Sequence, residues 1–300
     1  MNYKKIIPSQ DLRLRILKIL DFLPDKLMIK IQYKIATGRS VNLKNPQRLT
    51  DKIQWYKLYY RDKLMQKCVD KYTVREYVAS KGYSHLLTNL YGVYNNANEI
   101  DFNELPDKFV LKVTNGSHTN IICKNKNKLD INKVRNDLNN WLNKRSVKLG
   151  REWAYYNAKP LIICEEYLED AENQPNGIND FKFICMNGEV KYVWNDIDRY
   201  TNHKRNFYDR NWNFIDVKSD VENCGDIIEK PKGYEKMLEV AQALSKDFPQ
   251  VRVDLYWVNN KVYFGELTFY LLSGYVNFHP DKYDFIFGEE FKLPNKKNSK

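Results

Sequence analysis

Hydrophobic and polar residues alternate most clearly near the C-terminal end of the chain. The segments Arg252-Val-Asp-Leu-Tyr256 and Tyr263-Phe-Gly-Glu-Leu-Thr268 show this alternation, and Asn259-Asn260-Lys261 lies between them. β-Branched and aromatic residues on both sides of an Asn-rich turn predict two strands joined as a hairpin. Asp254 and Glu266 are 12 positions apart. In such a hairpin this spacing can place the two carboxylates side by side.

The same reasoning predicts elements along the rest of the chain, because a period of 3.6 indicates helices and runs of β-branched or aromatic residues indicate strands. The predicted helices cover 12–20, 27–35, 52–60, 70–78, 131–148 and 234–247, with Pro24 between the first two. The predicted strands cover 87–94, 108–113, 121–123, 161–168, 181–186 and 190–195. The turn Asn187-Gly188 joins the last two strands, and the acidic stretch 169–179 is a linker.

The charge of the chain is concentrated at its N-terminal end. Residues 1–60 contain thirteen Lys or Arg and four Asp or Glu, so they carry +9 of the net charge of +11. A basic amphipathic region of this kind can pack on the body with a solvated face, or it can lie on anionic lipid. The first interpretation is favoured, because moderate amphipathicity is typical of any surface helix. No nucleic-acid-binding motif accompanies the charge, so no nucleic acid is expected as a partner.

Several classes of protein are excluded by what the sequence lacks. It has no apolar run of eighteen residues that would predict a transmembrane helix, and no signal-peptide pattern. The five cysteines are scattered without a CxxC pair, which predicts buried thiols in a reduced, cytoplasmic protein. The sequence contains no HExxH motif of zinc hydrolases, no GxxxxGK[ST] motif of P-loop proteins and no GxGxxG motif of Rossmann folds. These three classes therefore have no support.

The candidate chemistry begins with the two acids of the hairpin. Asp254 and Glu266 lie among apolar residues, where carboxylates are costly unless a cation neutralises them. Mg²⁺ commonly combines one or two carboxylates with phosphate oxygens. The alternative is a solvated pair of surface acids. Upstream, Lys112 ends an apolar strand before a glycine-containing loop and suits a phosphate, while Lys71 is either a second phosphate contact or a surface lysine.

Two further clusters have open interpretations. Glu165-Glu-Tyr-Leu168 ends a buried strand and could meet an adenine edge and a ribose, or it could be a solvated strand end. Arg199, His203, Lys204 and Arg205 could clamp a carboxylate or a γ-phosphate, or they could form a solvated basic loop.

Taken together, these segments resemble the TupA-like ATP-grasp family. That family includes proteins from bacterial cell-surface polysaccharide clusters, some of them labelled glycosyltransferases. The resemblance covers roughly residues 45–290 and rests on Asp70–Tyr77, Leu105–Lys112, Asn120–Cys123, Glu165–Leu168, Asp180–Phe183, Arg205–Asp209, Arg252–Tyr256 and Gly265–Phe269. It implies an α+β ATP-grasp fold, in which two α+β lobes clasp ATP, with a mainly helical, basic N-terminal region. It also implies ATP and Mg²⁺ as cofactors.

The resemblance implies a role for each candidate residue. The phosphates of ATP would be contacted by Lys71, Lys112 and Lys182. The hinge that meets adenine and ribose would consist of Glu165, Glu166, Tyr167, Leu168 and Glu169. Mg²⁺ would be bound by Asp254, Glu266 and Thr268, the last at a position where many ATP-grasp enzymes have Asn. The charge of the transferred phosphoryl group would be stabilised by Arg252, Arg205 and Lys112.

The expected organisation has five parts. They are a basic helical region 1–50, a helical region 51–104, a first ATP-grasp subdomain 105–169 with the Lys112 strand and the hinge, a second subdomain 170–290 with the magnesium hairpin, and a disordered polar tail 291–300.

The function that the resemblance implies is ATP-dependent carboxylate–amine ligation. An amide would form through an acylphosphate on a uronic-acid-bearing saccharide, in capsule or other surface polysaccharide biosynthesis. The partners would be ATP, a uronate-bearing saccharide or sugar nucleotide, and a small amine. The location would be the cytoplasm, with peripheral contact at the inner face of an anionic membrane as an alternative.

Two other functions stay open. A glycosyltransferase that uses a nucleotide sugar would be consistent with the DxD pattern Asp196-Ile-Asp198. A degenerate ATP-binding scaffold would be consistent with the loops 114–120 and 269–274, which contain less glycine and proline than the resemblance predicts.

Overall fold

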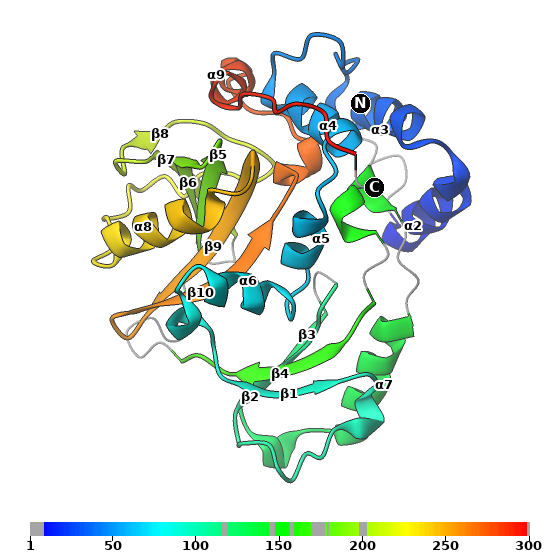
Figure 1. Ribbon diagram of the computed structural model, residues 1–300, viewed down its shortest axis with the longest axis vertical. Coiled ribbons are helices and arrows are strands. Elements are labelled where there is room, and N and C mark those ends of the chain that lie inside the picture. The colour runs from blue at the N-terminus through cyan, green and yellow to red at the C-terminus, as the bar shows by residue number, and fades with distance from the viewer. Residues whose placement is uncertain are drawn as a thin grey trace.

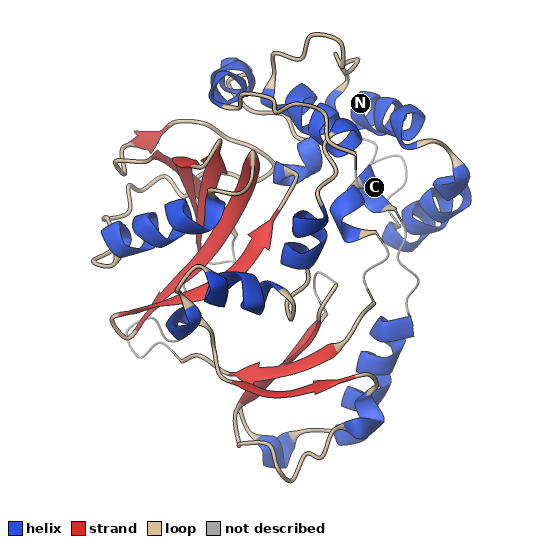
Figure 2. Ribbon diagram, in the orientation of Figure 1, coloured by secondary structure: helices blue, strands red, loops and turns tan. Residues whose placement is uncertain are grey.

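The computed structural model describes residues 9–115, 119–143, 148–156, 159–169, 178, 180–197 and 203–298. Two antiparallel sheets dominate it (Figures 1 and 2). The smaller sheet has the spatial order β1 (Leu90–Tyr94), β4 (Ile162–Glu166), β2 (Phe109–Val113), β3 (Asn120–Cys123). The larger has the order β10 (Lys261–Thr268), β9 (Gln250–Val258), β5 (Asp180–Met186), β6 (Glu189–Ile197), β7 (Lys204–Asp209), β8 (Phe214–Ile215). The predicted α+β fold class with two lobes is confirmed.

The smaller lobe has a core between its sheet and the helix α7 (Ile131–Asn143), which buries Val134 and Leu138. Phe109 and Leu111 of β2 belong to this core and are fully buried. Because side chains alternate along a strand, Lys112 is on the opposite face of the sheet, away from α7. The short helices η3 (Ala97–Glu99) and η4 (Lys126–Lys128) complete this lobe.

The larger lobe has α8 (Tyr234–Ser245) packed against one face of its sheet (Figure 2). Phe183 of β5 meets Tyr234 of this helix, with their ring centroids 5.9 Å apart. The alternation along β5 therefore directs Asp180 and Lys182 to the opposite face. Lys112, Asp180 and Lys182 are thus on the sheet faces that the packed helices leave free.

The helices α4 (Leu49–Tyr59), α5 (Lys63–Val69) and α6 (Val74–Ser80) lie between the two sheets and the N-terminal region (Figure 1). The predicted helix 70–78 is wrong at its start, since Asp70 does not open a helix. Its carboxylate accepts hydrogen bonds from the backbone N–H groups of Tyr72 and Thr73, both at 2.9 Å. This local turn separates α5 from α6 and leaves Lys71 in the connection between them.

The N-terminal region forms two helices, as predicted. They are α2 (Gln10–Ile19) and α3 (Asp25–Thr37), with η1 (Leu20–Phe22) between them and Pro24 as the N-cap of α3. The guanidinium of Arg151, from η5 (Leu149–Arg151), connects the N-terminal helices to the rest of the protein. It donates to the carbonyl oxygens of Leu20 and Leu23, at 2.8 and 2.9 Å. The next turn of the chain is η6 (Trp153–Tyr155), and η2 (Ser84–Leu86) follows α6.

The C-terminal segment is ordered where the structure describes it, which differs from the expected disordered tail 291–300. After η7 (Leu271–Gly274), the helix α9 (Lys282–Glu290) packs against α4. Phe291 is then fully buried, and Lys297 exchanges backbone hydrogen bonds with Tyr59 and Arg61 at 2.9 and 2.7 Å. The Lys/Asn-rich composition predicted disorder because it does not reveal these two attachments.

Two other predicted elements end differently. The helix predicted over 131–148 is described to Asn143, and residues 144–147 are outside the described ranges. The basic cluster predicted as a loop contains the strand β7 from Lys204 onward, whereas Arg199 is outside the described residues. In the described part of the chain, none of the helices combines the length and the apolar character needed to cross a bilayer.

Candidate functional site

The hairpin of β9 and β10 aligns the two predicted metal-binding acids. Asp254 is directly opposite Glu266, and Arg252 is opposite Thr268. The register shifts between Phe264 and Glu266, so Gly265 is the extra residue of a β-bulge. A regular ladder would have paired Asp254 with Gly265, and the Glu266 carboxylate would then be on the other face. The bulge is therefore what brings the two acids together.

Replacing Gly265 by Val is expected to destabilise the hairpin by about 1–3 kcal/mol, the usual range for overpacking. A Cβ atom there would lie 3.0 Å from the Asp254 carbonyl oxygen and 3.1 Å from the ring of Tyr256. Urea denaturation followed by circular dichroism measures the change. An unchanged free energy of unfolding would show that the bulge does not depend on glycine.

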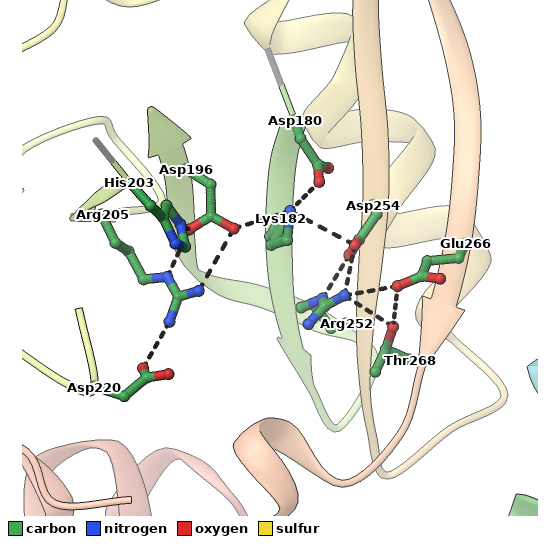
Figure 3. A network of polar contacts seen from close by, with 10 residues as sticks. All are labelled: Asp180, Lys182, Asp196, His203, Arg205, Asp220, Arg252, Asp254, Glu266 and Thr268. Atoms are coloured by element: carbon green, nitrogen blue, oxygen red, sulfur yellow. Dashed lines mark hydrogen bonds and ion pairs between the residues drawn. The ribbon is translucent and has the colours of Figure 1, made fainter. Parts of the chain in front are cut away.

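The guanidinium of Arg252 joins the acids of this hairpin (Figure 3). It holds Asp254 in a bidentate contact, with both donor–acceptor distances at 2.6 Å. Its Nη2 also donates to Oε1 of Glu266 at 2.8 Å and to Oγ1 of Thr268 at 3.0 Å. The structure thus brings together four residues that the sequence predicted for one site.

The electrostatic environment of the two acids differs. Burial raises the pKa of Asp254, which is 2 % exposed, although Arg252 and Lys182 oppose this effect. Burial acts in the same direction on Glu266, but there the cations Arg252 and Lys71 outweigh it and lower the pKa. The Glu266 side chain is 44 % exposed, which is consistent with a carboxylate that stays ionised.

The donor set of the hairpin fits a magnesium ion. One oxygen each from Asp254, Glu266 and Thr268 lies within 2.6–3.0 Å of the same atom, Nη2 of Arg252. Mg²⁺ is usually bound by one or two carboxylates together with water and phosphate oxygens, whereas here the guanidinium of Arg252 fills the point on which these three oxygens converge. The described residues contain no group of three or more His, Cys, Asp or Glu able to hold a metal. A magnesium ion here would therefore need phosphate oxygens to complete its coordination.

A second network extends from the hairpin across β5, β6 and β7 (Figure 3). The ammonium of Lys182 contacts Asp180, lies 3.2 Å from Oδ2 of Asp196 and 3.9 Å from Oδ2 of Asp254. Arg205 donates from Nε to Oδ1 of Asp196 at 2.6 Å. Burial alone would raise the pKa of Asp196, but Lys182 and Arg205 lower it well below its usual range. Lys182 therefore links this network to Asp254 of the hairpin.

Arg205 and its neighbours differ from the sequence-based expectation. Arg205 was expected to contact phosphate, yet its guanidinium is bound to Asp196 and, at 2.9 Å, to Asp220. His203 lies 3.1 Å from Asp196. No role was predicted for Asp180, and Asp196 was considered only as part of a DxD pattern. The sequence could have predicted that these two acids are neighbours. Asp180 and Asp196 are about equally far from the turn Asn187-Gly188, and they pair with each other in the hairpin that this turn forms.

The two predicted phosphate-binding lysines come from different elements, Lys112 from β2 of the smaller sheet and Lys71 from the connection between α5 and α6. Nζ of Lys112 lies 2.6 Å from Oε2 of Glu165, whose other oxygen accepts from Arg75 at 3.0 Å. Lys71 is also in this group, since it interacts electrostatically with Glu266, Lys112 and Glu165, and burial lowers its pKa. Lys71 thus interacts electrostatically both with Lys112 of the smaller sheet and with the hairpin acid Glu266 of the larger one.

The side chains of the first two predicted hinge residues, Glu165 and Glu166, are on different faces of the smaller sheet and have different partners. Glu165 and Glu166 alternate along β4, and only Glu165 is on the face with Lys112. Glu166 accepts hydrogen bonds from the backbone and side chain of Asn89, at 3.2 and 2.9 Å. Leu168 is half-buried.

The other two hinge residues face lysines. The Tyr167 ring lies 5.8 Å from Nζ of Lys124, and Glu169 forms an ion pair with Lys108 at 2.6 Å. The carbonyl oxygen of Glu169 also accepts from Asn259, in the turn of the hairpin. The glycine loop that was predicted to follow β2 lies at 116–118, outside the described residues.

The fold and this site define the class of protein. Two lobes with antiparallel sheets, with Lys112 on the smaller sheet, an Asp–Glu–Arg group on the larger one and Lys71 interacting with residues of both, form an ATP-grasp arrangement. The family model described as TupA-like ATPgrasp matches residues 51–292. The chain therefore belongs to the TupA-like ATP-grasp family, and the resemblance seen in the sequence is confirmed.

Comparison with curated proteins gives no match. Solved structures with a similar fold include D-alanine–D-alanine ligase from Bacillus anthracis, at 16% identity and a TM-score of 0.40 over 67% of this chain and 57% of the ligase. The enzyme of the same name from Helicobacter pylori has 13% identity and a TM-score of 0.41, over 76% of this chain and 59% of that protein.

Phosphoribosylamine–glycine ligase from Thermotoga maritima has 13% identity and a TM-score of 0.41, over 70% of this chain and 50% of that protein. The chain thus spans only about half of the length of these ligases. These similarities are too low to transfer a substrate or the role of a residue.

Proposed function

We propose that this protein is a Mg·ATP-dependent carboxylate–amine ligase. The observation that carries the proposal is that Lys71 interacts electrostatically both with Lys112 of the smaller sheet and with Glu266 of the hairpin. Separate lobes thus present cations and metal-binding oxygens to one place, as a nucleotide triphosphate requires. Phosphoryl transfer depends mainly on positioning and charge stabilisation, so a site without a covalent nucleophile suits it.

In the proposed reaction, a substrate carboxylate oxygen attacks the γ-phosphorus of ATP. The bond between that phosphorus and the β–γ bridging oxygen breaks, ADP leaves, and an acylphosphate forms. An amine nitrogen then attacks the acyl carbon, phosphate leaves, and the amine loses a proton to give the amide. Mg²⁺ held by Asp254, Glu266 and Thr268 would neutralise charge on the phosphate oxygens.

The residues of the chain have distinct parts in this proposal. Lys71, Lys112 and Lys182 bind phosphate oxygens, and the Lys112 side chain is 32 % exposed although Glu165 holds it in place. Arg252 stabilises the negative charge of the transferred group, which its contacts with Asp254 and Glu266 orient it to do. Arg205 acts through Asp196, which in turn positions Lys182.

The proposed carboxylate belongs to a uronic-acid-bearing saccharide or sugar nucleotide, and the amine is small. The support for this choice is the family membership together with the basic charge of the chain, which suits an acidic saccharide. The proposed setting is capsule or other surface polysaccharide biosynthesis. The proposed location is the cytoplasm, at the inner face of the membrane.

The test is ADP release by the purified full chain with Mg·ATP, a panel of uronic acids and uronate sugar nucleotides, and a panel of small amines. Release that requires both a carboxylate and an amine is expected. With hydroxylamine as the amine, the acylphosphate should yield a hydroxamate, which the ferric chloride colour reaction detects. Chelation of Mg²⁺ by EDTA should stop both signals.

Other results would overturn the proposal. Release of a nucleoside diphosphate from a sugar nucleotide without ATP would indicate a glycosyltransferase. Binding of ATP in calorimetry, without turnover on a panel that includes carboxylate-bearing polymers, would indicate a degenerate scaffold.

A further inference from the structure

The two N-terminal helices expose an unusual amount of apolar surface. Among the described residues, twelve large hydrophobic side chains are exposed, and six of them lie between positions 12 and 35. These six are Leu12 (49 %), Ile19 (71 %), Phe22 (79 %), Leu27 (46 %), Ile31 (37 %) and Ile35 (46 %). Single exposed hydrophobic residues are normal, but a group of this size on two helices indicates a surface that binds something.

On α3 the apolar residues form a row beside a row of lysines. Leu27, Ile31 and Ile35 recur every four residues, and Lys26, Lys30 and Lys34 precede them by one position each; all six are exposed. The opposite side of α3 packs on the body through Met28, Ile29 and Tyr33, which are almost completely buried. The helix therefore needs only one face for the fold, and the other is an aliphatic stripe with adjacent positive charge.

Two acidic residues near this face, Asp21 and Asp25, have partners outside α2 and α3. Asp25 is held by Arg61 and Arg151, at 3.0 and 3.2 Å, and its side chain is only 19 % exposed. Asp21 accepts a hydrogen bond from the backbone of Lys148 at 3.2 Å. Among the described residues, no ion pair joins Lys26 or Lys30 to an acid. The α3 side of this surface thus presents lysines, whereas Asp21 and Asp25 bind groups outside the two helices.

We propose that the exposed face of α2, η1 and α3, called here the arm face, binds an anionic lipid bilayer. The arm face consists of Leu12, Ile19, Phe22, Leu27, Ile31 and Ile35 with Lys26, Lys30 and Lys34. A helix that is apolar on one side and lysine-rich beside it lies in the interface plane, where acyl chains take the apolar residues and headgroups take the lysines. This inference rests on the location proposed above and is independent of the proposed ligation chemistry.

The arrangement of the molecule is compatible with this binding. Figure 1 shows α2 and α3 at the right-hand edge, far from α8 and from the strands β5 to β8 at the left. The arm is also anchored firmly, since Arg151 is 2 % exposed and bonded to its carbonyl groups. A bilayer bound at this edge would leave the Arg252 group, on the larger sheet, open to substrates.

The experiment is co-sedimentation of the full chain with vesicles of phosphatidylcholine alone and of phosphatidylcholine with 30 mol % phosphatidylglycerol, an amount on the order of that in anionic membranes. Binding to the anionic vesicles is expected to be at least about 10-fold stronger. The double variant Lys26→Gln/Lys30→Gln should lose about 10-fold of that binding. Phe22→Ser/Ile31→Ser should lose a similar factor, because it removes the inserted side chains.

Matched variants on the far side of the molecule serve as controls. Ile227 is 71 % exposed, like Ile19, so Ile227→Ser tests whether any exposed isoleucine contributes. Lys232→Gln/Lys236→Gln removes two exposed lysines near and on α8. Both controls should bind vesicles as the unaltered chain does. The arm variants should also keep their circular dichroism melting temperature, and with soluble substrates they should keep the ADP release of the unaltered chain.

Four results would overturn the proposal. They are no binding to either vesicle, equal binding to both, loss of binding in the far-side controls as well, or loss in none of the variants. If light scattering showed a dimer that Phe22→Ser/Ile31→Ser dissociates, the arm face would instead bind a second copy. If the lysine variant lost affinity for a soluble polyuronate while vesicles were not bound, the ligand would be an acidic polymer. None of these results depends on whether the chain ligates carboxylates.

Discussion

Glu266→Gln is expected to lower Mg-dependent ADP release at least about 10²–10³-fold, the usual loss when one preorganised charge-stabilising group is removed. The amide keeps the shape of the side chain but removes the charge that faces Arg252 and Lys71 and that would bind Mg²⁺ in the proposed site. Because the Glu266 side chain is 44 % exposed, its substitution should leave the melting temperature nearly unchanged. Steady-state ADP release across a range of Mg²⁺ concentrations measures the effect.

Asp254→Asn should give a similar loss of turnover together with a loss of stability. Asp254 is buried and holds Arg252 in a bidentate contact. Asp254→Asn removes a negative charge that balances the buried guanidinium of Arg252, and a buried charge without its partner destabilises the fold. Comparing the two variants therefore separates the catalytic contribution of the acids from their structural contribution.

Glu189→Gln is the matched control for both substitutions. Glu189 is on β6 of the same sheet, its side chain is 57 % exposed, and its partner is Lys191. This variant should turn over normally. Normal turnover by Glu266→Gln as well would mean that the hairpin acids do not form the metal site.

The hairpin shows how far the sequence predicts the site. The spacing of Asp254 and Glu266 around an Asn-rich turn predicted two adjacent carboxylates, and the register confirms that they are opposite each other. The bulge at Gly265 could not be predicted, since a regular hairpin with the same turn would have separated them. Here the acids were predicted correctly and the backbone irregularity that aligns them was not.

Contacts between distant segments were the main omission. Arg75 and Glu165 are 90 positions apart and form an ion pair at 3.0 Å. Periodicity and turn signals are local, so they contain no information about this pairing. Arg205 was predicted to contact phosphate, and the same local signals did not reveal that Asp196 and Asp220 bind its guanidinium.

For the loop 269–274, the composition did not reveal the backbone conformation. The sequence showed few glycines there, which suggested an altered loop. In the structure Tyr270, Leu272 and Ser273 have φ values of 61°, 48° and 54°, a left-handed conformation that side chains rarely adopt. Such strain persists only where surrounding contacts impose it. Those contacts come from α4, which composition alone does not place beside this loop.

The most important of these contacts is Lys57. Its ammonium is buried and donates to the carbonyl oxygens of Ser273 and Gly150, at 2.5 and 2.7 Å. It also lies 4.1 Å from the centroid of the Tyr275 ring. Burial lowers the pKa of Lys57 to about 7, and the nearby acid Glu152 opposes this effect. One lysine thus fixes two loops in a position next to the strand that ends at Thr268.

Lys57→Met is expected to reduce the free energy of unfolding by about 3 kcal/mol. The methionine fills the space, but the carbonyl groups of Ser273 and Gly150 lose the ammonium and, among the described residues, keep only Gln54 Nε2 at 3.0 Å and the Tyr275 hydroxyl at 3.4 Å as donors. A hydrogen bond to a charged group contributes about 1.5–3 kcal/mol. Chemical denaturation at pH 7 measures this change. The double variant Lys57→Met/Glu152→Gln should be less destabilised than the single one, because removing the lysine alone leaves Glu152 buried without its counter-charge. An equal loss in both variants would show that the two side chains do not interact.

The pH dependence of the same variant provides an independent test. The pKa of Lys57 is lowered in the folded protein, so between about 7 and its ordinary value of 10.5 the unfolded chain binds more protons than the folded one. Stability contributed by this group must therefore rise with pH across that window, by at most about 1.4 kcal/mol per unit. Lys57→Met has no titrating group at this position, so its free energy of unfolding should not show this rise. The difference in free energy of unfolding between the unaltered chain and the variant should therefore grow between about pH 7.5 and 9.5. A deficit that is constant with pH would mean that Lys57 keeps its proton at high pH, and that the buried amine is held as a cation by Glu152.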